Sequence, residues 1–122
     1  MVTCQKKISP KEITIIYKYE YYTRIDSLVI SKDTIKMNNE NLFLLDKKMI
    51  LYRNQEIEIK KYQYTKDKLS NYFINDSLGI IVEYGATHPR GKIIRRYEQK
   101  KYKELCDEIM TDSVFFNLQF NF

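Results

Sequence analysis

The stretch Ile13-Thr14-Ile15-Ile16-Tyr17-Lys18-Tyr19-Glu20-Tyr21-Tyr22, near the start of the chain, decides the fold. Ile and Tyr occupy its alternate positions, and Thr, Lys and Glu fall between them. A period of two is the signature of a half-buried strand, and Tyr and Ile pack well on a pleated surface. The stretch therefore predicts a strand that turns one face toward a core.

Seven further segments carry strand signals. They are residues 28–30, 34–37, 42–45, 49–52, 56–60 and 78–84, and 92–97 returns as the partner of 78–84. The runs 42–45 and 49–52 flank a polar break and suggest a β-hairpin. In 56–60, Ile57 and Ile59 are expected to face inward. The run 78–84 is almost continuously apolar, which is typical of a central strand.

The composition agrees with a small globular protein. The chain has 122 residues, 43% of them hydrophobic and 14% aromatic, which suits one domain with a real core. Only three Gly and two Pro are present. The turns must therefore be built mainly from Asn, Asp, Ser and Lys.

One helix is expected over about 98–110, followed by a terminal strand. The predicted helix has one apolar stripe, formed by Tyr102, Leu105, Cys106, Ile109 and Met110. After it, apolar residues alternate over 114–122, which predicts a last strand tied into the sheet. The predicted fold class is α+β, a mostly antiparallel sheet with one helix packed on it. A barrel closed by the terminal strand is the alternative, and its order of elements resembles that of lipocalin-like barrels.

The first residues, Met1-Val2-Thr3-Cys4-Gln5-Lys6-Lys7, suggest a location. A Cys followed by a polar, Lys-rich stretch resembles the mature end of small lipoproteins of Bacteroidetes-type bacteria. The resemblance implies export and lipidation of Cys4, with acyl chains that hold the protein on a bilayer. The alternative is that Cys4 is an ordinary residue of a frayed terminus. We expect a flexible tether over 1–11 and a single α+β domain over 12–122.

The sequence has no recognisable catalytic motif. His88 is the only histidine, and a lone His forms no catalytic triad without a nucleophile and an orienting acid. Glu56 and Glu58 share a strand face, but an exposed, charged strand face explains them better than acid–base catalysis. Two Cys without His neighbours form no zinc site, so we expect neither a metal nor a cofactor.

The densest basic stretch lies at 90–103, in a chain of formal charge +5. It contains Arg90, Lys92, Arg95, Arg96, Lys100, Lys101 and Lys103, with Tyr97 and Tyr102 among them. Such a stretch could meet an acidic protein, anionic lipid or single-stranded nucleic acid. Nucleic acid is the less favoured partner because 16 acidic residues dilute the 21 basic ones. The candidate partner-binding residues are His88, Arg90, Lys92, Arg95, Arg96 and Tyr97.

These observations favour a non-enzymatic binding module of an exported, lipid-anchored protein. An immunity lipoprotein, which neutralises a secreted toxin in the periplasm, is one concrete version, and its partner would be a protein. Two alternatives stay open. One is an intracellular nucleic-acid-binding domain that uses the stretch 90–103, and the other is a lipocalin-like binder of a small ligand.

Overall fold

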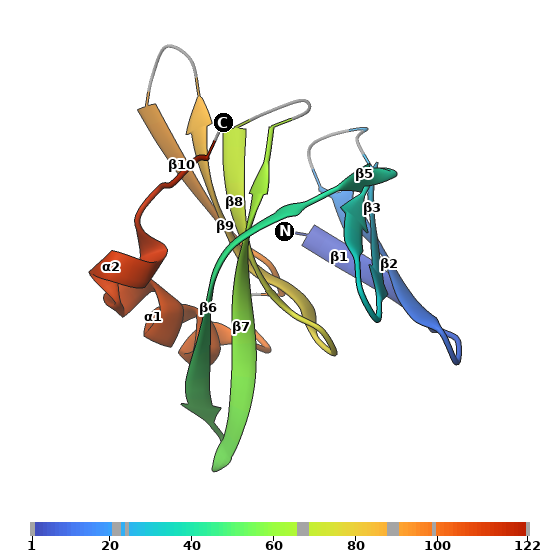
Figure 1. The fold of residues 1–122 in the computed structure, drawn as a ribbon, viewed down its shortest axis with the longest axis horizontal. Coiled ribbons are helices and arrows are strands. Elements are labelled where there is room, and N and C mark those ends of the chain that lie inside the picture. The colour runs from blue at the N-terminus through green and yellow to red at the C-terminus, as the bar shows by residue number, and fades with distance from the viewer. Residues whose placement is uncertain are drawn as a thin grey trace. The chain divides into compact units, whose positions relative to one another are not determined.

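Antiparallel strands make up most of the chain, which confirms the predicted fold class. The structure is a computed structural model, and it describes residues 2–20, 23, 25–65, 69–87, 91–98 and 100–121. The chain divides into two compact units, Met1–Leu42 and Phe43–Phe122. Each unit contains one five-stranded sheet (Figure 1). Each sheet is open, with two edge strands among the described residues, so the barrel alternative and its lipocalin-like version are wrong.

The first unit is a meander whose strands pair in chain order. Its strands are β1 (Val2–Ile8), β2 (Glu12–Tyr19), β3 (Ile25–Ser31), β4 (Ile35–Met37) and β5 (Glu40–Asn41). The stretch that begins at Ile13 forms most of β2, and its alternate residues Ile15, Tyr17 and Tyr19 are buried as predicted. Asn38 and Asn39, both with positive φ, turn the chain between β4 and β5. Asn tolerates this backbone region better than most residues.

The amino-terminal residues differ from the predicted flexible tether. Val2–Ile8 is an edge strand, paired with β2 from Val2↔Tyr19 to Ile8↔Ile13. Every residue of β1 is half-buried or exposed, so backbone pairing rather than an apolar face defines the strand. The sequence therefore carries no period of two there. The boundary between the units after Leu42 also differs from the single domain expected over 12–122.

The second unit has the strand order β10-β9-β8-β7-β6. Its strands are β6 (Phe43–Tyr52), β7 (Gln55–Tyr64), β8 (Leu69–Asn75), β9 (Gly79–Thr87) and β10 (Gly91–Arg96). The hairpin predicted within 42–52 is wrong, because both apolar runs belong to the one strand β6. The hairpin turn lies later, at Arg53 and Asn54, which both have positive φ. The polar residues between the runs fit within β6, since Lys48 pairs with Ile59 and forms an ion pair with Asp112.

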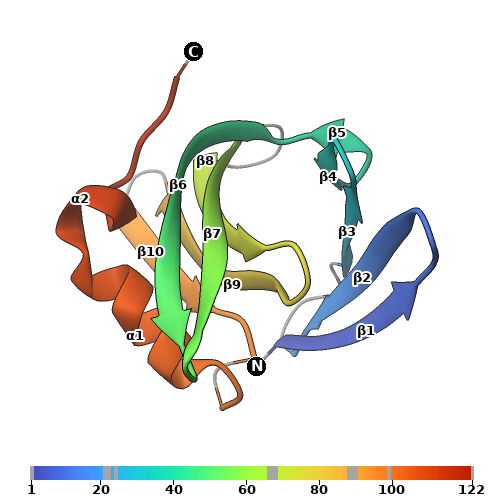
Figure 2. The same cartoon turned by 60° about the horizontal axis from the view of Figure 1, so that its bottom comes forward.

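Helix α1 (Lys103–Thr111) confirms the predicted apolar stripe. Leu105, Cys106 and Ile109 are buried, and they pack with Ile59 and Phe73 of the sheet. Figure 2 shows α1 and the short helix α2 (Ser113–Phe116) along one face of this sheet. The opposite face of the sheet is free of helices among the described residues.

The predicted terminal strand is wrong. The Asp112 side chain accepts a hydrogen bond from the Phe115 N–H and caps α2, because Asp at this position satisfies a free backbone donor. The helix turns Phe115 and Phe116 into the core and leaves Val114 81% exposed. Residues 117–121 follow without helix or strand, and Figure 1 shows them running along the sheet toward the top of β8.

Two alanine variants distinguish the observed helix from the predicted strand. We expect Val114→Ala to lower the free energy of unfolding by less than about 0.5 kcal/mol, as at other exposed sites. Phe115→Ala should lower it by about 3 kcal/mol or more, because a buried ring is lost. Urea unfolding measures both values. The strand pattern requires the reverse order, with Val114 inside and Phe115 outside.

Candidate protein-interaction surface

The described basic side chains of β10 do not assemble into one patch. Successive side chains of β10 point to opposite faces, so Lys92 and Arg96 lie on the helix face and Arg95 on the other. The Arg96 Nη2 atom lies 3.6 Å from Met110 Sδ and 3.9 Å from Asp107 Oδ1, which both belong to α1. Arg96 is therefore part of the contact between sheet and helix.

Arg95 and Tyr97 converge on a buried carboxylate. Glu83 of β9 is 5% exposed. Its Oε1 atom accepts hydrogen bonds from the Tyr97 hydroxyl at 3.0 Å and from Arg95 Nη1 at 3.3 Å. Its other oxygen accepts from the Ser70 hydroxyl at 2.7 Å. A buried charge is tolerated when it is paired and hydrogen-bonded in this way. Because Tyr97 is 1% exposed, these contacts hold the sheet together and do not face a partner.

Of the remaining predicted site residues, Lys92 lies on the opposite face of β10 from this cluster. His88 and Arg90 fall outside the described residues. Lys92 Nζ lies 5.8 Å from the centre of the Tyr84 ring, within range of a cation–π contact. Cys4 pairs with Tyr17 in the register of β1 and β2 and is partly exposed.

Cys4 is partly exposed and Cys106 is buried, so the two cysteines differ in chemistry. Cys106 is buried in α1, as its place in the apolar stripe predicts. Burial raises the pKa of its thiol, because the desolvated thiolate is disfavoured. Cys106 is therefore a poor nucleophile, and the more accessible Cys4 is the better substrate for a modification.

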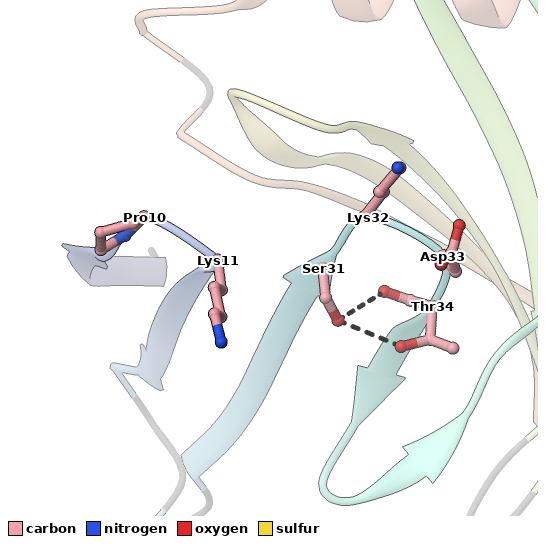
Figure 3. Close-up of a pocket in the computed structure, with 6 residues that line it drawn as sticks. All are labelled: Pro10, Lys11, Ser31, Lys32, Asp33 and Thr34. Atoms are coloured by element: carbon pink, nitrogen blue, oxygen red, sulfur yellow. Dashed lines mark hydrogen bonds between the residues drawn. The ribbon is translucent and has the colours of Figure 1, made fainter.

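A shallow groove of about 510 Å³ lies in the first unit (Figure 3). It is lined by Pro10, Lys11, Ser31, Lys32, Asp33 and Thr34. The Ser31 hydroxyl lies 3.1 Å from the Thr34 hydroxyl, so these polar groups satisfy each other within the turn. The groove is open, and its lining residues include no large aliphatic or aromatic side chain of the kind typical of a small-molecule site.

Among the residues that the structure describes, no three His, Cys, Asp or Glu side chains are grouped to hold a metal ion. Within the same ranges, none of the helices combines the length and apolar character needed to cross a bilayer.

An apolar surface that the sequence did not reveal lies on the hairpin of β6 and β7. Met49 is 53% exposed and Leu51 67% exposed, and both turn away from the helices. In the register, Met49 lies opposite Glu58 and Leu51 opposite Glu56, so the four side chains share one face. We call Met49, Leu51, Glu56 and Glu58 the hairpin surface.

The hairpin of β6 and β7 extends beyond β8. In the register, β8 pairs with β7 only over residues 60–64, so 55–59 pair with β6 alone. The other face of the hairpin carries Ile50, Ile57 and Ile59, which pack toward the helices. The apolar character of Met49 and Leu51 therefore adds nothing to the helix-side core.

Charge at the base of the hairpin surface is organised around Lys60. Its ammonium lies 3.0 Å from Asp76 and 3.7 Å from Glu58. Burial opposes the charged form, but the hydrogen bond and the charge of Asp76 outweigh it, so the pKa of Lys60 is raised. Glu56, farther out, remains an exposed carboxylate beside Leu51.

Comparisons with protein-family models, curated proteins and solved structures returned no match to this chain.

A double-mutant cycle checks the role of the Glu83 cluster. A Cβ at position 85 would lie 2.9 Å from the Ser70 hydroxyl oxygen, so Gly85→Ala must displace that hydroxyl from Glu83. We expect a loss of about 1–3 kcal/mol in the free energy of unfolding, because a buried carboxylate loses a donor. In the Ser70→Ala background the same change should cost little. Equal costs in both backgrounds would show that the hydroxyl is not the obstacle.

Proposed function

We propose that this chain is a non-enzymatic protein-binding module, exported and held on a membrane by a lipid at Cys4. The hairpin surface is the observation that carries the proposal, because exposed apolar side chains flanked by polar ones are typical of interaction sites. An immunity protein that neutralises a secreted toxin is its concrete version.

The chemistry of the hairpin surface defines the partner. Met49 and Leu51 offer an apolar centre, and Met adapts well to irregular partner surfaces. Glu56 and Glu58 at its margin favour a partner whose apolar contact is bordered by Lys or Arg. Such a charged margin raises the rate of association more than the affinity, and salt screens it.

The register of β1 is compatible with the anchor. If Cys4 becomes the first residue of the mature protein, the pairs from Cys4↔Tyr17 to Ile8↔Ile13 remain, so β1 survives processing. The acyl chains would then start directly at the sheet edge. Lys6 and Lys7 are exposed close by and would lie near the headgroups.

Partner binding is tested with the purified product of the gene adjacent to this one, titrated calorimetrically. We expect binding by the intact chain and a loss of at least about tenfold for Leu51→Asp, because a charge enters the apolar centre. Val114→Asp is the matched control, since Val114 is an exposed apolar residue on α2 and not on the hairpin surface. Absence of binding, or equal losses in both variants, contradicts the proposal.

The lipid anchor is tested by the intact mass of the protein isolated from its native cells. We expect the added mass of a diacylglyceryl thioether at Cys4 and recovery in the membrane fraction. Cys4→Ala should move the protein to the aqueous fraction without changing its thermal stability, since Cys4 is only partly buried. An unmodified Cys4 in the native protein would refute the anchor and leave the hairpin surface untouched.

A further inference from the structure

Residues 117–121 lie against the helix face of the second unit's sheet, held by side chains instead of a backbone ladder. Asn71 of β8 donates from Nδ2 to the Gln119 carbonyl, and its Oδ1 accepts from the Gln119 N–H, both at 2.7 Å. Gln63 of β7 does the same for Asn121, at 3.1 Å and 2.6 Å. Each amide side chain thus binds the donor and the acceptor of one backbone residue.

Asn71 and Gln63 thus recognise the backbone of the bound segment and not its side chains. Gln63 and Asn71 lie directly opposite each other in the register, and the residues that they bind are two apart. Two residues is the repeat of an extended chain. Any extended segment presents the same N–H and C=O groups, so these four hydrogen bonds do not require the sequence of residues 117–121.

Lys61 adds a preference that the chain's own segment does not fulfil. It is fully buried, and its ammonium donates to the Asn117 carbonyl, Asn117 Oδ1 and Gln119 Oε1 at 2.6, 3.0 and 3.1 Å. These three acceptors are neutral. Hydrogen bonds between charged groups are stronger, so carboxylates in place of the two side-chain amides would hold the ammonium better.

The pKa of Lys61 also favours a carboxylate as its partner. Burial lowers the pKa of Lys61, and the charge of Asp46, its opposite in the register, only partly offsets the effect. The ammonium therefore lies in an environment with too little negative charge. A second carboxylate brought by a ligand would supply it.

We propose that Lys61, Gln63 and Asn71 form a binding site for an extended acidic segment of a partner protein, which residues 117–121 fill in its absence. We call these three residues the cradle. The segment would carry Asp or Glu at the positions of Asn117 and Gln119. The cradle is separate from the hairpin surface, since Lys61 packs on the helix face, within 5.7 Å of the Phe73 ring.

The helices are held to the sheet by contacts that precede the segment that would leave. Helix α2 ends at Phe116, whose ring stacks on Tyr84 at 4.6 Å and packs on Phe73 at 5.3 Å. These contacts hold the helices before the segment begins. Release uncovers the polar groups of the cradle, which another ligand then satisfies.

The test uses the full chain with Gln119→Pro and Asn121→Pro, because Pro removes the two backbone donors that the cradle binds. The probes are labelled, end-blocked peptides, Asp-Leu-Glu-Phe-Asn and Asn-Leu-Gln-Phe-Asn, followed by fluorescence anisotropy. We expect the acidic peptide to bind at least about tenfold more tightly than the neutral one. The matched control, Gln119→Ala with Asn121→Ala, keeps both backbone donors and should bind the acidic peptide at least about tenfold more weakly, since its own segment competes.

Lys61→Met in the proline background isolates the charge. It should abolish the preference for the acidic peptide and keep the binding that Gln63 and Asn71 provide. Equal affinities for the two peptides before this change, or no binding by the folded proline variant, would overturn the proposal. Circular dichroism verifies folding.

A second measurement uses the unmodified chain, so that the proposal does not depend on a variant that folds. Amide resonances of Gln119 and Asn121 are followed during titration with the acidic peptide, and both should move to the positions of a free segment. Unchanged resonances at saturating peptide also overturn the proposal. Leu51→Asp should behave as the unmodified chain does, which separates this outcome from that of the hairpin surface.

Discussion

Phe73 lies between Phe115 and Phe116, with ring centres 5.2 and 5.3 Å away, and this contact joins the helices to the second sheet. Aromatic pairs at these distances stabilise the fold beyond the effect of the apolar area that they bury. The contact fixes the helices on one face of the sheet. Met49 and Leu51 are exposed on the other face of the hairpin, whereas Lys61 is buried on the same face as Phe73.

The sequence predicted those elements in which the spacing of the apolar residues matches the repeat of the backbone structure. The alternation that begins at Ile13 is β2, and the stripe around Leu105 is α1. The terminal strand failed because alternate apolar residues over 114–122 also contain the adjacent pair Phe115 and Phe116, which a helical turn can bury together. Asp112 decides between the two by capping the helix. Edge strand β1 has no apolar face, so a pattern search cannot find it.

The candidate site was predicted less well, for a physical reason. Charges that cluster in sequence are separated by strand geometry, since neighbours on β10 face opposite sides of the sheet. Arg95 forms an ion pair with Glu83 on the neighbouring strand, and no local sequence pattern predicts that pairing. The hairpin that carries Leu51 extends beyond β8, which pairs with β7 only from residue 60 onward, and this is a property of register. The Arg95–Glu83 pairing and the register of β8 are both features of the tertiary structure, and local sequence patterns do not contain them.

The two proposed surfaces differ in what they recognise. The hairpin surface offers side chains, so its partner must match an apolar centre and two carboxylates. The cradle offers amides to a backbone and one ammonium to an acidic side chain, so it tolerates varied sequences that share an extended shape. Because the cradle is filled by the chain itself, a partner segment must compete with a tethered ligand at high effective concentration. Only a segment with better acceptors for Lys61 has an advantage there, and the buried ammonium is therefore the group that would make the exchange selective.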